Sequence, residues 1–229
     1  MLYAPSMSMF ELDGPRVGPA AGGKPDSVVA LLHGLGADGN DLISLAPVFS
    51  RALPNTAFVS PHAPFPCDMA PYGRQWFSLQ DRDPARVLAG VRAAAPILDG
   101  FIDAELARWG LPPERLALLG FSQGTMMSLH VAPRRAAAIA GVVGYSGALV
   151  GAELLAAEIK ARPPVLLVHG DADPIVPFQA MARAAQALGD NGISVETLAC
   201  PDLPHSIDED GIRAGLEFLM GALGRTLTA

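Results

Sequence analysis

The sequence predicts an α/β fold, a doubly wound and mostly parallel β-sheet in one domain over residues 1–229. Three observations predict it. From Ser27 onward, short apolar runs alternate with helical patterns, which is the order of strand-helix-strand units around a parallel sheet. Half of the residues are hydrophobic and only 17% are charged, which suits strands that are buried on both faces. A length of 229 residues suits one large core.

Six apolar runs are too short for helices and are mostly bounded by Gly, Pro, Asn or Asp, so they are predicted to be strands. In chain order these are Val28–Leu32, Ala57–Ser60, Leu116–Gly120, Ile139–Tyr145, Val165–His169 and Val195–Ala199. Helical patterns lie between them, and Asn40 and Asp83 are expected to cap the first two. The predicted helices are Asp41–Leu53, Pro84–Trp109, Gln123–Ala132, Ala152–Ala161, Pro177–Leu188 and Ile207–Leu223.

Two segments fall outside this alternation. Within residues 1–26, Ser8–Leu12 is expected to form an edge strand and Gly14–Pro25 a loop rich in Gly and Pro. The connection Pro61–Arg82 is long and rich in proline, yet it contains the aromatic pair Trp76 and Phe77. Because long connections in compact domains are often functional, residues 61–82 are expected to border a substrate groove.

Composition and charge exclude several classes of protein. A net charge of -7 without a run of Lys or Arg argues against nucleic acid as a partner. The uncharged stretch Ala136–Ala152 contains four glycines and is shorter than the ~20 apolar residues of a membrane helix, so no integral membrane association is expected. The first residues show no basic leader followed by an apolar run, which favours the cytoplasm. Cys67 and Cys200 have no metal-like spacing and are expected to be free thiols, and no metal or other cofactor is predicted.

One motif points to chemistry. The segment Gly120–Gly124 fits the pattern G-x-S-x-G with Ser122 at its centre, after an apolar run and before a helical pattern. A serine on so tight a strand-to-helix turn needs small neighbours two residues away on either side. The following helix would direct its free N–H groups at an oxyanion, with the Gln123 N–H as the natural first donor. A second match around Ser146 precedes a poor helical pattern, so Ser146 is interpreted as a strand-end residue.

The partners of Ser122 follow from chain order, because an α/β-hydrolase places the acid and then the histidine after the nucleophile. His205 is the one histidine beyond the next plausible acid, and it lies between the last predicted strand and the last predicted helix. The turn after Val165–His169 offers both Asp171 and Asp173; position in the turn favours Asp173, and spacing alone leaves Asp171 open. Leu35, after the first strand, is expected to supply the second oxyanion N–H.

With these residues in place, the chain resembles the carboxylesterase/phospholipase family of α/β-hydrolases, which includes the acyl-protein thioesterases. The similarity covers nearly the whole length and includes Leu32–Asp41, Gly120–Gly124 and His169–Pro177, as well as Pro61–Pro64 and Arg74–Phe77. It implies Ser122 as nucleophile, Asp173 rather than Asp171 as acid, His205 as base, and Leu35 and Gln123 as oxyanion donors, in a fold with little or no cap domain. One departure is the pair Leu203 and Pro204, where the family usually has glycine before its histidine.

The function expected from the sequence is a serine hydrolase that cleaves a small-molecule carboxylic ester of short or medium acyl chain through an acyl-enzyme on Ser122. Trp76, Phe77, Ile175 and Val176 are expected to form the apolar wall of the site, with core packing as the alternative for each. Lysophospholipase or acyl-protein thioesterase activity is the first alternative function, and an inactive hydrolase fold kept as a binding module is the second. Assembly as a homodimer is left open.

Overall fold

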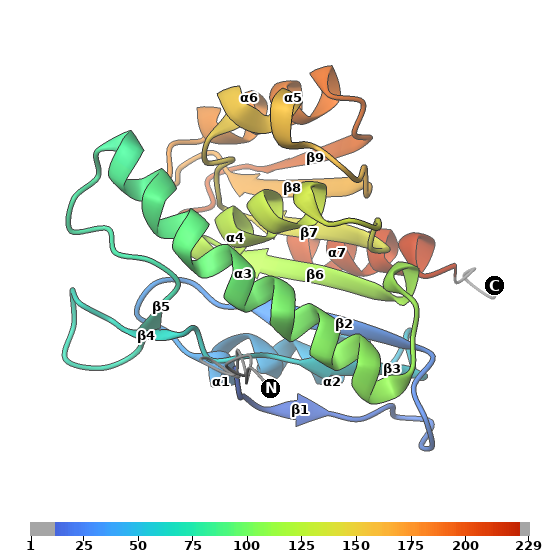
Figure 1. Ribbon diagram of the computed structural model, residues 1–229. Helices are drawn as coiled ribbons and strands as arrows, with labels where there is room; N and C mark the ends of the chain where they lie inside the picture. Colours follow the sequence, from blue (N-terminus) through green and yellow to red (C-terminus); the bar gives the residue numbers. More distant parts are fainter. Residues whose placement is uncertain (1–11, 225–229) are drawn as a thin grey trace, which may run out of the picture.

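The computed structural model describes residues 12–224, and within them one seven-stranded sheet organises the protein (Figure 1). The strand order is β1-β3-β2-β6-β7-β8-β9; every neighbouring pair is parallel except β1 with β3. The strands are β1 (Arg16–Val17), β2 (Ser27–Leu32), β3 (Thr56–Val59), β6 (Leu116–Phe121), β7 (Gly141–Tyr145), β8 (Val165–Gly170) and β9 (Val195–Cys200). All six strands predicted from the sequence are present, and the mostly parallel α/β fold is confirmed.

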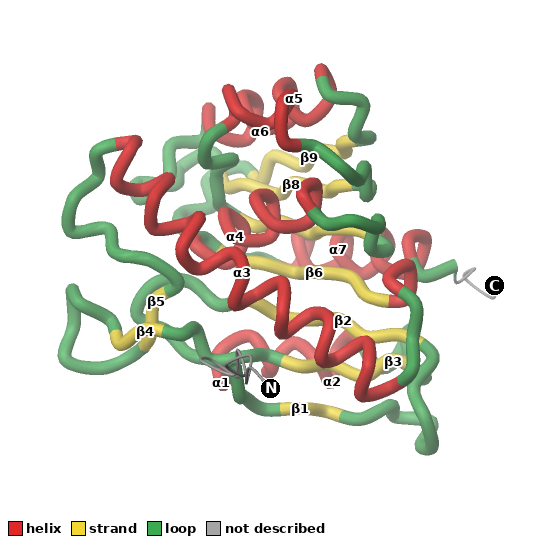
Figure 2. Tube along the Cα trace, in the orientation of Figure 1, coloured by secondary structure: helices red, strands yellow, loops and turns green. Residues whose placement is uncertain are grey.

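Helices cover both faces of the sheet (Figures 1 and 2). One face carries α3 (Pro84–Trp109), α4 (Gln123–Val131), α5 (Leu155–Glu158) and α6 (Gln179–Asp190). The other carries α1 (Gly39–Leu42), α2 (Ala46–Phe49) and α7 (Glu209–Ala222). Among the helices of residues 12–224, none combines the length and the apolar character needed to cross a membrane.

Strand β2 shows why the composition is so apolar. All six of its residues are buried. Val28, Ala30 and Leu32 pack into the core under α3 and α4, whereas Val29 and Leu31 point the other way, toward α2 and α7. A strand that has helices on both sides cannot alternate apolar with polar residues, because each of its faces is an interior surface. The expectation of strands buried on both faces is therefore confirmed.

Two predicted helices are wrong in extent. The segment predicted as a helix over Asp41–Leu53 splits into α1, a 3-10 turn at Ile43–Leu45 and α2. Its cap is Asp38 rather than Asn40, since the Asp38 carboxylate accepts the Asn40 N–H at 2.8 Å. The segment predicted over Ala152–Ala161 keeps only a 3-10 turn and α5. It ends early because the N–H groups of residues 160 and 161 donate to the Pro133 carbonyl instead of continuing the helix.

The N-terminal segment and the long connection Pro61–Arg82 also differ from expectation. The edge strand expected at Ser8–Leu12 falls outside the described residues except for Leu12, which is in no strand. The loop expected at Gly14–Pro25 contains β1, which pairs antiparallel with β3 as the sheet edge. The connection Pro61–Arg82 folds back on itself in a small hairpin of β4 (Phe65–Pro66) and β5 (Arg74–Gln75). Strands of two residues carry too little hydrophobic alternation to be seen in a sequence.

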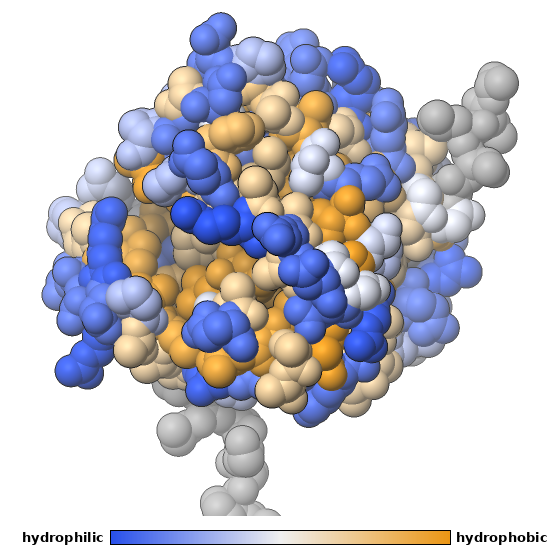
Figure 3. Space-filling view, turned by 90° about the horizontal axis from the view of Figure 1, so that it is seen from above, coloured by the Kyte–Doolittle hydropathy of each residue, from blue (hydrophilic) through white to orange (hydrophobic). Residues whose placement is uncertain are grey.

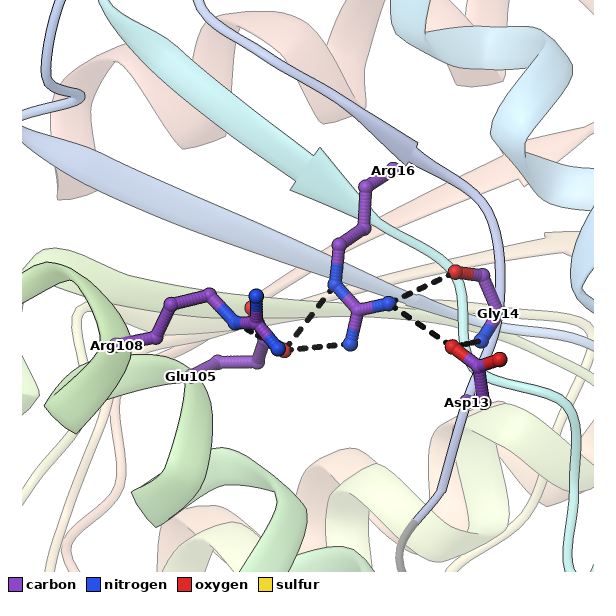
Figure 4. A network of polar contacts seen from close by, with 5 residues as sticks. All are labelled: Asp13, Gly14, Arg16, Glu105 and Arg108. Atoms are coloured by element: carbon purple, nitrogen blue, oxygen red, sulfur yellow. Dashed lines mark hydrogen bonds and ion pairs between the residues drawn. The ribbon is translucent and has the colours of Figure 1, made fainter.

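A buried ion pair fastens the edge strand β1 to helix α3 (Figure 4). The Glu105 side chain is 3% exposed, and its Oε1 atom accepts from the Arg16 guanidinium at 2.8 Å, with Arg108 at 3.4 Å on its other side. Arg16 also donates to the carbonyl of Gly14 and to the Asp13 carboxylate, which lie at the start of the described chain. The pair joins residues 89 positions apart in sequence, so no local pattern predicts it.

We expect Arg16→Met to lower the free energy of unfolding by roughly 1–3 kcal/mol, because it leaves the Glu105 carboxylate buried with only the longer Arg108 contact. Urea denaturation measures the change. Arg213→Met is the matched control: its pair with Asp210 is 65% exposed on both sides, so a loss of at most about 0.5 kcal/mol is expected. Equal losses in the two variants would contradict a structural role for the Arg16–Glu105 pair.

Candidate active site

The candidate residues gather at the edge of the sheet where the parallel strands end, on the left in Figure 1. Ser122 directly follows β6, Asp173 follows β8, and His205 follows β9. Leu35 follows β2, the neighbour of β6 on its other side. In open α/β sheets this edge is where loops from different strands converge, so residues distant in sequence come together there.

Ser122 occupies the tight turn that the motif predicted. Its backbone has φ 53° and ψ −114°, a region that L-residues avoid and that costs about 1–3 kcal/mol. A Cβ atom on Gly120 would lie 2.4 Å from backbone atoms of Gly124 and Thr125, and one on Gly124 would lie 1.8 Å from the Leu32 carbonyl oxygen. Both glycines are therefore required by space. Helix α4 begins at the next residue, so its N-terminus lies beside the Ser122 side chain.

The second motif, at Ser146, turns out to share the strained backbone but not the setting. Ser146 has φ 47°, and it directly follows β7, as expected for a strand-end residue. It is 1% exposed and its hydroxyl has no hydrogen-bond partner among the described residues. No helix starts at the following residue. The two serines thus share a positive φ, and only Ser122 combines it with a helix N-terminus at the next residue.

The acid and the histidine are in direct contact. The His205 Nδ1 atom lies 2.7 Å from Asp173 Oδ2, while Asp173 Oδ1 accepts the N–H groups of Ile175 and Val176 at 2.8 and 2.9 Å. Burial alone would raise the pKa of the Asp173 carboxyl, but the hydrogen bonds from His205 and from these two N–H groups outweigh it and hold the pKa below its usual value. The carboxylate is therefore ionised at neutral pH. The contact holds the His205 ring with Nδ1 toward this carboxylate, so Nε2 is the ring nitrogen that is free to face a substrate.

Asp171, the alternative acid, does a different task. Its Oδ1 atom accepts the Asp202 N–H at 2.7 Å, which joins the turn after β8 to the loop that carries His205. Leu203 binds the same turn through its carbonyl oxygen, which accepts the Ala172 N–H. The departure at Leu203 and Pro204 is accommodated by Gly170, because a Cβ there would lie 2.1 Å from the Leu203 oxygen. The geometry thus brings Asp173, and not Asp171, to His205.

His205 also packs against the residue before the serine. The rings of Phe121 and His205 are 4.7 Å apart between centroids, and Phe121 is the last residue of β6. On the other side of the turn, a Cβ on Gly34 would lie 3.3 Å from Ser122 Cβ, so the segment with Leu35 lies directly against the serine. The segment after β2 therefore lies against Ser122, and the His205 ring packs on the residue before it; within residues 12–224 no hydrogen bond joins Ser122 Oγ to His205.

Two backbone N–H groups beside Ser122 are unused. Neither the Leu35 N–H nor the Gln123 N–H donates to another group of residues 12–224. The Leu35 segment is held by His33, whose Nε2 atom accepts the Ala63 N–H at 3.0 Å. The ring proton must then lie on Nδ1, from which it donates to the Gly34 carbonyl, and burial lowers the pKa of this imidazole. Two fixed and unpaired donors next to a serine can bind an oxyanion.

The connection Pro61–Arg82 is hydrogen-bonded to the segment that contains Leu35 and holds it in place. Arg74 exchanges backbone hydrogen bonds with Gly36 and Ala37, and its guanidinium donates to the Ala63 and Pro64 carbonyls. This role of Arg74 was not predicted. The sequence indicated only that Arg74 lies in a segment, Arg74–Phe77, that resembles the family.

The Gln123 side chain supports the same connection from the nucleophile helix. Its oxygen accepts the Trp76 N–H at 3.1 Å, and its nitrogen donates to the Phe77 carbonyl at 2.8 Å. This side chain is fully buried. The Gln123 side chain therefore holds the connection in place, a role that the motif did not predict, while its backbone N–H stays a candidate oxyanion donor.

The four residues expected to form an apolar wall are not alike. Trp76 and Phe77 are 0% and 2% exposed, and the indole N–H donates to the His33 carbonyl, so both side chains are core residues with no surface open to a ligand. The expectation of a groove lined by these two is corrected: their ring area is used to pack the hairpin on α3 and α4. Val176 is 7% exposed, and Ile175, at 57%, is the member of the set that faces solvent. In Figure 3 apolar side chains gather in the middle of the face seen from above, with polar ones around them.

A mostly parallel sheet flanked by helices, with a strained serine between strand and helix and a contacting acid and histidine on later loops, defines an α/β-hydrolase. The family model described as Phospholipase/Carboxylesterase matches residues 17–222. The chain belongs to this family, and the resemblance seen in the sequence is confirmed.

Individual relatives are of the same kind. A crystal structure of esterase PE8 superposes with a TM-score of 0.90 at 38% identity, covering 93% of this chain and 100% of that one. A probable carboxylesterase of Oryza sativa subsp. japonica is 31% identical over 83% of this chain and 76% of its own length. Acyl-protein thioesterase 1 of Schizosaccharomyces pombe is 30% identical over 86% of this chain and 92% of its own length.

Proposed function

We propose that this protein is a serine carboxylesterase that hydrolyses small carboxylic esters of short to medium acyl chain, with Ser122, His205 and Asp173 as its catalytic triad. The observation that carries the proposal is the Asp173–His205 contact of 2.7 Å beside a serine held in a strained strand-to-helix turn. That contact fixes the proton on Nδ1 and leaves Nε2 as the base. Membership of the phospholipase/carboxylesterase family supports the same reaction class.

In the first half of the reaction His205 Nε2 takes the hydroxyl proton as Ser122 Oγ attacks the ester carbonyl carbon. The carbonyl oxygen becomes an oxyanion, and the N–H groups of Leu35 and Gln123 would bind it. Asp173 stabilises the imidazolium that forms, which its depressed pKa allows because it stays ionised in the buried site. The imidazolium then gives its proton to the departing alcohol oxygen, which leaves an acyl group on Ser122.

In the second half water replaces the alcohol. His205 Nε2 removes a proton from the water as its oxygen attacks the acyl carbonyl, and the same two N–H groups bind the second oxyanion. Collapse of this intermediate returns the proton to Ser122 Oγ and releases the carboxylic acid. Every proton moves between Ser122, His205 and water or alcohol, so the proposed cycle involves no cofactor.

The preference for short to medium acyl chains is proposed from the surface available beside the triad. Each methylene that an acyl chain buries contributes about 0.8 kcal/mol, so the gain ends where the apolar surface ends. Ile175, on the loop that carries Asp173, offers such a surface, whereas Trp76 and Phe77 are closed inside the core. We expect kcat/KM for a series of p-nitrophenyl esters from acetate to palmitate to reach its maximum at an intermediate chain length and then fall.

Thioester cleavage is the second candidate, favoured by the relatives that are named acyl-protein thioesterases. The same assay extended to an S-acyl thioester and a lysophospholipid of matched acyl chain separates these substrates, with Ser122→Ala as the blank. A kcat/KM that still rises at palmitate, or that is higher for the thioester than for its oxygen ester, would overturn the proposed substrate class. If the wild-type protein is no more active than Ser122→Ala on any of these substrates, the binding-module alternative is favoured. The cytoplasmic location and the homodimer stay predictions.

A further inference from the structure

A second histidine lies behind the candidate triad. His169 is near the end of β8, is 2% exposed, and was interpreted from the sequence as an ordinary strand-end residue. Its Nε2 atom lies 3.0 Å from the Val176 carbonyl oxygen and 3.3 Å from Asp173 Oδ2. Asp173 Oδ2 is the same atom that contacts His205 at 2.7 Å. One carboxylate oxygen is therefore approached by two imidazole rings, one on β8 and one on the loop after β9.

The contacts fix where the His169 proton lies. A carbonyl oxygen can only accept, so Nε2 must carry the hydrogen that it shares with Val176. Asp173 Oδ2 lies 3.3 Å from the same Nε2 atom, so the polarised N–H attracts the carboxylate electrostatically while its hydrogen bond goes to the Val176 carbonyl. The other oxygen, Oδ1, is already held by the N–H groups of Ile175 and Val176. Rotation of the carboxylate would therefore break contacts at both of its oxygens.

We propose that His169 is a positioning residue of the triad, whose Nε2–H holds Asp173 Oδ2 toward His205 and takes up part of the negative charge on that oxygen. The inference rests on the proposed function, because it acts through Asp173 and His205 and not on the substrate. The strand register brings the same elements together. The Ser122 N–H donates to the Tyr145 carbonyl and the Ser146 N–H to the Val168 carbonyl, so the pairing of β6, β7 and β8 continues to the level of Ser122 and His169.

Among residues 12–224, Asp173 is the ionisable group in contact with His169, and His205 contacts the same Asp173 oxygen. Its neighbour across β9 is Ala199, and the ring of Phe178, just before α6, lies 6.0 Å away edge-on. Other titratable groups on the packed elements have partners of their own or are neutral: Asp171 accepts from the Asp202 N–H, Cys200 contacts Asp208 and burial raises its pKa to about 11, and Tyr145 donates to Gly211.

His169→Phe removes the N–H while keeping a flat ring, and His169→Gln restores an N–H donor of similar reach. In the Phe variant no N–H offsets the negative charge on Asp173 Oδ2, so this oxygen stabilises the His205 imidazolium more strongly. We therefore expect the acid limb of the kcat/KM profile to move to higher pH. We also expect kcat on an ester substrate to fall by roughly 10- to 100-fold with KM little changed, as for a small misplacement of a catalytic group. The Gln variant should return the acid limb to its wild-type position and recover most of kcat.

His130→Phe is the matched control, because His130 is also a buried histidine, 3% exposed, but lies near the far end of α4 from Ser122. It should leave the acid limb in place. If His169→Phe does not fold, His169→Asn takes its place, since its shorter amide cannot reach Oδ2. A wild-type acid limb in the Phe or Asn variant, or no rescue by Gln, would overturn the role of His169. Failure of the proposed function is a separate outcome, in which Ser122→Ala keeps its activity whatever stands at position 169.

Discussion

Replacement of Ser122 by alanine is expected to lower kcat for ester hydrolysis by about 10⁶-fold, the order of loss seen when a triad nucleophile is removed. The physical reason is that Ser122 is the hydroxyl residue on the turn before α4, where the His205 ring packs on Phe121 and the segment of Leu35 lies against the serine. Binding and the two N–H donors would remain, so a small residual rate over water is expected. The measurement is steady-state hydrolysis of a p-nitrophenyl ester by purified protein.

Ser146→Ala is the matched control, since Ser146 has the same motif and a similar backbone but is closed off from solvent. We expect it to keep kcat within tenfold of the wild-type value, because its hydroxyl contacts neither Asp173 nor His205 through any hydrogen bond of the described residues. Circular dichroism of both variants checks that each is folded. Activity retained in Ser122→Ala, or lost equally in folded Ser146→Ala, would contradict the assignment.

The second large effect is expected at Asp173. Asp173→Asn should lower kcat by on the order of 10⁴-fold, because an amide can stabilise the wrong tautomer of His205 and cannot stabilise its imidazolium. Asp171→Asn should cost far less. An asparagine oxygen there can still accept the Asp202 N–H that the aspartate accepts now. Comparison of kcat for the two variants at the same pH measures the difference.

The two aspartates are two residues apart and carry the same charge, so each variant controls for the effect of removing one carboxylate from this loop. Equal losses would mean that the loop as a whole, and not the Asp173–His205 contact, determines the rate. A larger loss in Asp171→Asn would mean that Asp171, and not Asp173, is the acid.

Much of the fold could be predicted because its elements have strong local signals. Strand β2 is an uninterrupted apolar run, and it is buried on both faces as such a run requires. Helix α3 begins after Asp83, whose carboxylate accepts the N–H groups of Ala85 and Arg86, and its predicted bounds are those observed. Where several local signals in the sequence agree with one another, the predicted element matches the observed one.

The errors arise where tertiary contacts override local preference. Trp76 and Phe77 follow a proline-rich stretch that suggested a surface groove, yet hydrogen bonds from Trp76 to Gln123 and His33 draw them into the core. The Arg16–Glu105 pair joins β1 to a helix far along the chain and leaves no periodic trace. Neither effect depends on neighbours in sequence, so no pattern in the sequence could show it.

The candidate site is intermediate between these cases. Gly120 and Gly124 identified the turn at Ser122 because only glycine fits so close to neighbouring backbone. His205 followed from chain order. The choice between Asp171 and Asp173 required coordinates, since the two residues occupy one turn and differ only in which atoms they face. The position of His169 behind Asp173 likewise depends on how the turn after β8 folds back on its own strand.

The central claim is that Ser122 is the nucleophile, and labelling with a fluorophosphonate followed by peptide mapping tests it most directly. The reagent reacts preferentially with an activated serine, so it reports the nucleophile without a choice of substrate. We expect one modified residue, Ser122, in the folded wild-type protein, and no modification after unfolding or in Ser122→Ala. Modification at Ser146 or at any other residue, or no modification of the folded protein, would contradict the account.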